Sequence, residues 1–360
     1  MVQHAVNAKG RIEVADVLRG LAVMGIILLH SIEHFNFYSF PDTSGQSPWL
    51  NFTDKAIWDG LFFLLGGKAY AVFALLFGFS FYIQDRNQRL RGNDFRLRFC
   101  WRLVLLFLIG NLNAMFFTAE VLVLYSLAGF ILPLTCRLKD KTLLWLAAIL
   151  LIQPVPLYYL LRALADPAFV TPVIPTGSFW AVTFEAQSHG TFMETLRVNL
   201  WEGQLASLAW AWDNGRVFQT MALFLLGFYV GRRGWFEETH LSVWTSVFVR
   251  AIVVFFPLYG LGNMLPDFIV NKSVLTPLLL IITSLYKFAF MLMLVSGVLF
   301  AFYRFGWRKR LMTIAPYGRT PARPRRACCG TPAPSAGPTG CWPPGWSRTP
   351  PSRTKDLLVQ

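Results

Sequence analysis

Long apolar runs dominate the pattern along the chain and recur from residue 17 to residue 303, separated by polar connections. A helix needs roughly twenty mostly apolar residues to cross about 30 Å of hydrocarbon. The pattern therefore predicts an all-α transmembrane bundle with about eight spans. The runs are residues 17–37, 56–84, 99–117, 121–136, 143–164, 208–231, 242–264 and 275–303.

The second run is too long for one straight crossing, because a helix over 56–84 would reach roughly 43 Å. The paired glycines Gly66 and Gly67 weaken a helix and predict a break, and a half-helix end inside a bundle can bind polar groups. The alternative is an unbroken, tilted helix in which Lys68 extends along its own apolar stem to reach water. The sequence leaves both arrangements open.

Composition supports a membrane environment, since 55% of the residues are hydrophobic, 14% are charged and the mean hydropathy is +0.47. These values lie outside the soluble range and predict the lipid bilayer as the main partner. The net charge of +14 comes from short basic clusters between the runs, so it does not indicate nucleic acid. Two His and one Glu at the end of the first run are too few ligands to predict a metal site.

The basic clusters occupy alternate connections and so predict the topology. They lie at residues 86–102, 137–141, 232–233 and 304–310, whereas the connections around residues 38–55, 118–120, 165–195 and 265–274 contain only Lys55 and Lys272 as basic residues. By the positive-inside rule, the first sixteen residues and the end of the bundle are both cytoplasmic. We therefore expect a cytoplasmic N-terminus over 1–16, a transmembrane domain over 17–303 and a basic cytoplasmic segment over 304–319.

Residues 320–360 form a tail of different composition. The stretch 320–356 has no Leu, Ile, Val, Met or Phe but nine Pro, so it is predicted to be disordered. Two origins are open: a natural basic tail that contacts anionic lipid, or translation in a shifted reading frame, which we favour.

Several ordered motifs carry a family resemblance. The opening RIEVADVLRGLA (Arg11–Ala22) has an R-x-x-x-x-D-x-L-R-G-x-A pattern, and GKAYAVFALLFG (Gly67–Gly78) and GRVFQTMALFLLGFYVGRRGWF (Gly215–Phe236) follow it. The chain resembles the YeiB-like bacterial membrane protein family (domain of unknown function 418). Asn113 and Glu120 stand where that family often has His and Asp. The resemblance also implies that about two further helices, which would follow residues 317–319, are missing.

The D-x-L-R-G opening is distantly similar to transmembrane acyltransferases. This similarity implies a multi-pass protein of the bacterial inner membrane. It also implies transfer of an acyl group from a cytoplasmic thioester, with acyl-CoA as donor, to an envelope-glycan acceptor. Histidine is the usual catalytic group in such enzymes. No tightly bound cofactor is predicted.

His30, Glu33 and His34 are spaced i, i+3, i+4, which places them on one stripe at the outer end of the first helix. A histidine beside a carboxylate can accept and return a proton near neutral pH, as acyl transfer requires. We predict these three as catalytic residues, with His30 as the base. The alternative is that they simply mark the end of a span.

Asp16 and Arg19 are one turn apart at the start of the first helix. Arg19 is a candidate for binding a phosphate of the donor, with Asp16 orienting it; the alternative is an interfacial ion pair. Lys68 and Lys287 lie within apolar runs, where a charge is costly and usually faces the bundle interior. We expect Lys287 to meet a carboxylate, with Glu120 or Asp59 as candidate partners, or a chain of backbone carbonyls.

Three functions follow from these candidates. The first is the acyltransferase, the second is a small-metabolite transporter or permease with Lys68 and Lys287 in its pathway, and the third is a non-enzymatic membrane protein. A polar group next to Trp210 and Trp212, namely Asp213, Asn214 and Arg216, is interpreted as a helix cap within an aromatic belt.

Overall fold

The computed structural model describes residues 6–7, 11–35, 40, 45–118 and 120–314, all of which belong to one compact unit, Met1–Arg319. Apart from a two-residue antiparallel pair, β1 (Val6–Asn7) and β2 (Arg11–Ile12), the described elements are helices. The predicted all-α class is therefore confirmed. The predicted tail, 320–360, lies outside the described residues.

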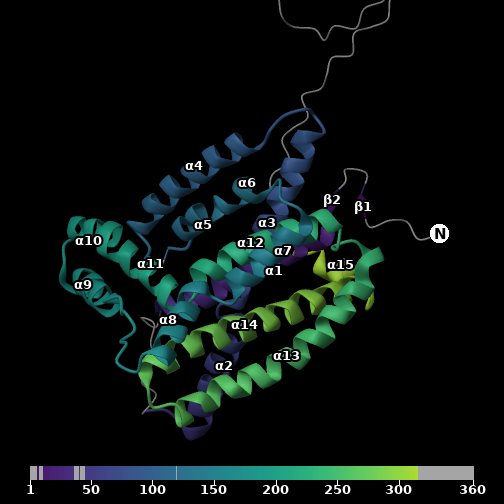
Figure 1. Ribbon diagram of the computed structural model, residues 1–360. Helices are drawn as coiled ribbons and strands as arrows, with labels where there is room; N and C mark the ends of the chain where they lie inside the picture. The colour runs from purple at the N-terminus through teal and green to yellow at the C-terminus, as the bar shows by residue number, and fades with distance from the viewer. Residues whose placement is uncertain (1–5, 8–10, 36–39, 41–44, 119, 315–360) are drawn as a thin grey trace, which may run out of the picture. The chain divides into compact units, whose positions relative to one another are not determined.

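The helices follow the apolar runs closely (Figure 1). Their bounds are α1 Glu13–Phe35, α2 Pro48–Leu65, α3 Lys68–Arg89, α4 Arg96–Ala114, α5 Leu122–Gly129, α6 Ile131–Thr135, α7 Asp140–Leu151, α8 Pro154–Ala165, α9 Thr176–His189, α10 Phe192–Val198, α11 Gln204–Asp213, α12 Arg216–Arg233, α13 Leu241–Phe268, α14 Lys272–Tyr303 and α15 Arg308–Leu311. A π-helical turn, Asn199–Gly203, joins α10 to α11, and a 3-10 turn, Glu238–His240, precedes α13.

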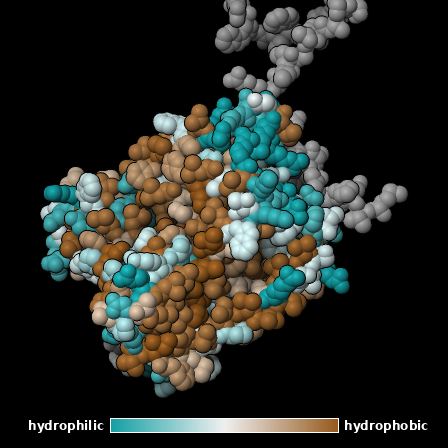
Figure 2. Space-filling view, in the orientation of Figure 1, coloured by the Kyte–Doolittle hydropathy of each residue, from teal (hydrophilic) through white to brown (hydrophobic). Residues whose placement is uncertain are grey.

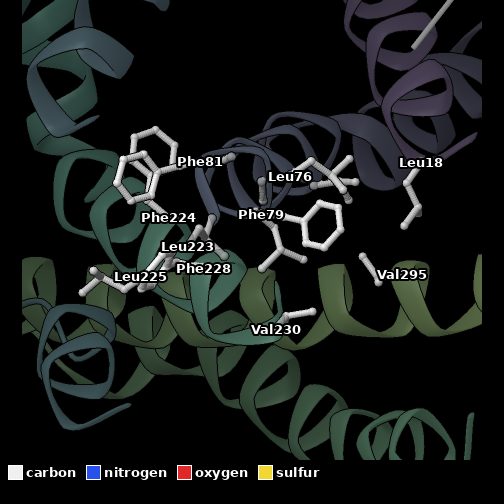
Figure 3. Close-up of a cluster of buried hydrophobic side chains, with 14 of the residues drawn as sticks. Leu18, Leu76, Phe79, Phe81, Leu223, Phe224, Leu225, Phe228, Val230 and Val295 are labelled. Atoms are coloured by element: carbon white, nitrogen blue, oxygen red, sulfur yellow. The ribbon is translucent and has the colours of Figure 1, made fainter. Parts of the chain in front are cut away.

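Helices α3 and α12 form the centre of the core. Two glycines let them approach closely, because a Cβ on Gly78 would lie 1.9 Å from the carbonyl oxygen of Phe224, and one on Gly227 would lie 1.8 Å from that of Leu75. Side chains from α1 and α14 complete the core around this pair. Figure 3 shows Leu18, Leu76, Phe79, Phe224, Phe228 and Val295 among these buried residues.

Five helical segments are long and apolar enough to cross a membrane: α1, the pair α2 and α3 taken together, α4, α13 and α14. A sixth results if α7 and α8, which are bent by 54°, count as one span. Figure 2 shows a broad hydrophobic band on one face, with hydrophilic residues gathered at its ends. Exposed apolar side chains of α4 and α13, such as Ile109 and Phe256, contribute to the lipophilic surface. The chain is an integral membrane protein.

The predicted count of eight spans is not confirmed. The run 121–136 folds as two short helices, α5 and α6, which are too short to cross. The run 208–231 is divided between α11 and α12. Helix α12 is packed inside the bundle, where Leu223, Phe224 and Leu225 are each at most 1% exposed. Its apolar residues serve the protein core instead of facing lipid.

The break in the second run is confirmed. Helix α2 ends at Leu65, Gly67 adopts a left-handed conformation with φ of 74°, and α3 begins at Lys68. Lys68 is only 5% exposed, so it does not extend outward as a tilted helix would require. The run 143–164, which we expected to be one span, is also interrupted, at Gln153 before Pro154, between α7 and α8.

Candidate functional site

The break between α2 and α3 buries a lysine at the start of a helix. The Nζ of Lys68 donates a hydrogen bond to the carbonyl oxygen of Phe63 over 2.5 Å. The same ammonium lies 5.1 Å from the ring centroid of Phe63 and 5.3 Å from that of Phe290. These contacts stabilise the buried charge in part, through the carbonyl dipole and the negative faces of the rings.

Two further cations approach this break. A Cβ on Gly67 would lie 3.5 Å from Nη2 of Arg216 and 4.0 Å from Cδ of Lys287, so both side chains reach the same turn. The charges of Lys68, Arg216 and Lys287 interact electrostatically with one another. We call these three residues the cation cluster. In the part of the chain that the structure describes, none of them forms an ion pair with a carboxylate.

Aromatic rings hold Arg216 in place. Its guanidinium carbon lies 4.2 Å from the ring centroid of Trp210 and 5.2 Å from that of Tyr70. The charge of Glu33 also acts on Arg216, although the two do not form an ion pair. The guanidinium is therefore attracted by π-electrons and by one nearby carboxylate, while the two lysines repel it.

Three left-handed helix junctions surround the cluster. Gly67, Gln153 and Gly215 precede α3, α8 and α12 with φ values of 74°, 62° and 66°. The Nε2 of Gln153 donates to the carbonyl oxygen of Gly215 over 2.8 Å and to Oγ of Ser284, one turn before Lys287, over 2.9 Å. The first N–H groups of α3 and α12 have no partner within their helices, so both helix starts add partial positive charge.

Buried polar atoms without partners lie next to these junctions. Gln153 is fully buried and its Oε1 has no hydrogen-bond partner, and the hydroxyl of Tyr70 is buried without one. Gln219, one turn into α12, donates to the carbonyl oxygen of Ser284 over 3.2 Å. The region around the cation cluster is thus polar in the middle of an otherwise apolar bundle.

Two of the three predicted catalytic residues are in contact. The Nδ1 of His30 and Oε2 of Glu33 are 3.2 Å apart, and the imidazole packs edge-on against the ring of Phe117. The side chain of His34 lies outside the described residues. Because Glu33 acts on Arg216, the His30–Glu33 pair borders the cation cluster.

Asp16 and Arg19 form a separate site. The Nη1 of Arg19 donates to Oδ1 of Asp16 over 2.8 Å, and its Nη2 donates to Oγ of Ser80 on α3 over 2.8 Å. Arg19 precedes His30 by eleven residues on α1, which is about 16 Å along the axis. The structure therefore does not bring the predicted donor-binding pair and the predicted base together.

The prediction that Asp59 or Glu120 pairs with Lys287 is wrong. Asp59 is exposed and pairs with Lys55 on its own helix over 2.6 Å. Glu120 accepts hydrogen bonds from the Asn113 side chain and from the backbone N–H of Leu122, where a carboxylate stabilises the start of α5. No contact within the described part of the chain joins Glu120 to Lys287, which meets other cations instead.

Comparison with known proteins finds a family that is similar to part of the chain. Residues 230–321 match the family described as "Protein of unknown function (DUF418)". The chain is similar to the DUF418 family over this stretch. The matched stretch includes α13 and α14, and hence Lys287, but not Lys68, Arg216 or His30.

Two curated proteins are similar to parts of this chain. The "Uncharacterized protein YxaH" of Bacillus subtilis (strain 168) is 34% identical over 157 residues, which is 41% of this chain and 38% of that protein. The "Uncharacterized 39.9 kDa protein in amylase 3'region" of Bacillus acidopullulyticus is 28% identical over 142 residues, or 39% of each chain. The chain thus spans about two fifths of the length of these relatives. No solved structure matches. Neither name states an activity, so the acyltransferase resemblance stays a prediction.

The sequence suggested Arg216 as part of a helix cap and not as a residue of this site. Its neighbours Asp213, Trp210 and Trp212 suggested a helix cap at the membrane surface, but the N-cap of α12 is Gly215, and Arg216 is the first helical residue. A usable signal was present, since Gln219 and Thr220 follow one turn later within an apolar run and mark the same polar side of α12. Both are buried.

The chemistry that this arrangement favours is the binding of negative charge. Unpaired charges in a low-dielectric interior are costly and are usually neutralised by a partner. Here three cations and two helix starts converge, whereas the nearest carboxylate that acts on them is Glu33. The described residues contain no group of three His, Cys, Asp or Glu side chains placed to hold a metal ion.

Proposed function

We propose that this protein binds a small anion within the membrane, at the cation cluster, and carries it across as a transporter. The observation that carries the proposal is that Lys68, Arg216 and Lys287 meet without a carboxylate ion pair among the described residues. A carboxylate or phosphate group on a substrate would neutralise part of this charge and so offset the cost of burying it.

The broken helices support the same function. Secondary transporters commonly bind substrates near the middle of the membrane, where discontinuous helices direct their N-terminal ends toward anionic groups. Helix α3 starts at the cluster after the left-handed Gly67, and α12 starts there after Gly215. The unpartnered Oε1 of Gln153 and hydroxyl of Tyr70 provide further polar atoms near the site.

Binding can be tested with matched lysine variants on one helix. Lys287 lies within the cluster, whereas Lys272 is exposed at the start of α14. We expect at least one of acetate, succinate and phosphate to raise the thermal unfolding midpoint of the detergent-purified full chain and of Lys272→Gln. Lys287→Gln should bind that anion about tenfold more weakly, because one charged hydrogen bond is lost.

The anion that stabilises the protein should then enter proteoliposomes in a labelled form, at a rate that Lys287→Gln abolishes and Lys272→Gln preserves. If every anion binds Lys287→Gln and Lys272→Gln with the same affinity, the cation cluster is not an anion site. If an anion binds Lys287→Gln more weakly but does not enter the proteoliposomes, the site binds anions without transporting them.

The second candidate function is transfer of an acyl group from a cytoplasmic thioester to an envelope acceptor, with His30 as the base. The observation in its favour is the 3.2 Å contact between His30 and Glu33 beside the cation cluster. Arg19 is about 16 Å away along α1, so a donor bound there would have to extend along the helix to reach His30.

A further inference from the structure

A second positively charged site lies at the other end of α3 and α12. It is a hollow of about 380 Å³. Three arginines, Arg86, Arg89 and Arg232, line it together with Asp85 and three largely apolar side chains, Tyr82, Leu90 and Phe228. The run from Lys68 to Arg89 is about 32 Å long. This arginine hollow is therefore separate from the cation cluster, and nothing argued about it depends on the proposed transport.

The three guanidinium groups differ in how they are held. Arg89 pairs with Oδ2 of Asp85 over 2.5 Å. Arg232 donates to Oδ1 of Asp140 over 3.0 Å and to the backbone carbonyl oxygen of Cys136. The side chain of Arg86 is exposed, and its guanidinium forms no hydrogen bond or ion pair with another described residue. Two arginines are thus fixed in position, and the third is available to a ligand.

The hollow keeps a net positive charge, because its lining has three arginines and one carboxylate. Asp85 is only 2% exposed, and its Oδ1 has no hydrogen-bond partner among the described residues. Because this oxygen is closed off from solvent, Asp85 holds Arg89 in place and offers no contact to a ligand in the hollow. The site therefore suits an anion.

The apolar part of the lining adds a second requirement. The buried ring of Phe228 lies 4.6 Å from the guanidinium carbon of Arg232 and helps to hold it. The exposed side chain of Leu90 places an apolar surface next to the charged one. Arginine binds phosphate through paired N–H donors. Basic pockets between transmembrane helices near the membrane surface bind anionic lipid headgroups. Phosphate next to an apolar chain is the chemistry of a phospholipid.

We propose that the arginine hollow is a binding site for a phosphate group, supplied by the headgroup of an anionic phospholipid such as phosphatidylglycerol. Arg86 closes on the phosphate that Arg89 and Arg232 already face. The acyl chains lie along the apolar surface of Tyr82 and Leu90.

The test uses the full chain in detergent and native mass spectrometry to measure bound lipid during titration with phosphatidylglycerol or phosphatidylcholine. Arg86→Gln is compared with Arg91→Gln, which removes an equally exposed arginine that does not line the hollow. We expect phosphatidylglycerol to bind the unmodified protein and Arg91→Gln equally. Arg86→Gln should bind it about tenfold more weakly, since one charge-assisted contact is lost.

Competition with inorganic phosphate identifies the source of the phosphate. If millimolar phosphate displaces the lipid from Arg91→Gln, and itself binds Arg86→Gln more weakly, the hollow is a phosphate site that also accepts soluble ligands. If phosphate has no effect, the site requires the lipid. Equal binding of the two lipids, or equal affinity of Arg86→Gln and Arg91→Gln for phosphatidylglycerol, overturns the proposal.

Discussion

His30 and Glu33 stand one helical turn apart on α1, and their Nδ1 and Oε2 atoms are 3.2 Å apart. A carboxylate in this position orients the imidazole. In acyl transfer, such a pair would take the proton from the acceptor hydroxyl as the acyl bond forms and return it to the leaving thiolate. Helix geometry alone accounts for the contact, because residues i and i+3 share a face.

Replacing His30 with Gln tests this role at a single residue. Acyl-CoA is supplied to the reconstituted protein with an envelope-glycan extract, and the thiol released is measured. If the acyltransferase function holds, His30→Gln should lower the rate about a hundredfold or more, which is the range for losing a general base. His189→Gln, at an exposed position on α9, is the control. Equal rates for the two variants would remove His30 from the chemistry.

At the scale of elements, the contact between α3 and α12 depends on two glycines. A Cβ on Gly227 would lie 1.8 Å from the carbonyl oxygen of Leu75, and backbone atoms cannot move aside as a flexible side chain can. This close packing holds the starts of both helices, and so Lys68 and Arg216, in the same bundle. Gly297 on α14 is different, because nothing lies within 4 Å of a Cβ there.

Gly227→Ala should therefore destabilise the protein by about 3 kcal/mol, since overpacking forces the two helices apart. Gly297→Ala should have the opposite sign and stabilise by up to about 1 kcal/mol, because alanine favours a helix interior over glycine. Thermal unfolding of both variants in detergent measures the difference. A Gly227→Ala midpoint at or above that of the unmodified protein would contradict the close packing.

At the scale of the whole described unit, arginines from connections far apart in sequence gather at one end. Arg86 and Arg89 follow one apolar run, Arg232 follows another, and all three line the same hollow. This agrees with the sequence expectation that these connections share one side. By the positive-inside rule, we expect that side to face the cytoplasm.

Thiol labelling in whole cells tests this orientation. In a background without native cysteines, Arg91→Cys reports on the arginine-rich end and Asp267→Cys on the end of α13; both positions are exposed. A membrane-impermeant maleimide should label Asp267→Cys in intact cells, and Arg91→Cys only after permeabilisation. The reverse pattern would show that the protein has the opposite orientation in the membrane. Labelling of both positions in intact cells would contradict a spanning bundle.

The sequence by itself determined the helical membrane class and the positions of most helices, and it indicated the break before Lys68 as one of two arrangements. These features depend on local pattern, because hydrocarbon requires long apolar helices with internally paired backbones, and paired glycines interrupt them wherever they occur. It also found the contact of His30 with Glu33, since one helical turn joins them.

Only the tertiary structure decided which helices face lipid and which charges meet. The run 208–231 was expected to span the membrane, yet packing places α12 in the core. Lys68, Arg216 and Lys287 come from three different helices, so their meeting depends on how α3, α12 and α14 pack. Sequence periodicity describes one helix at a time, and it carries no information about which side chains on separate helices lie together.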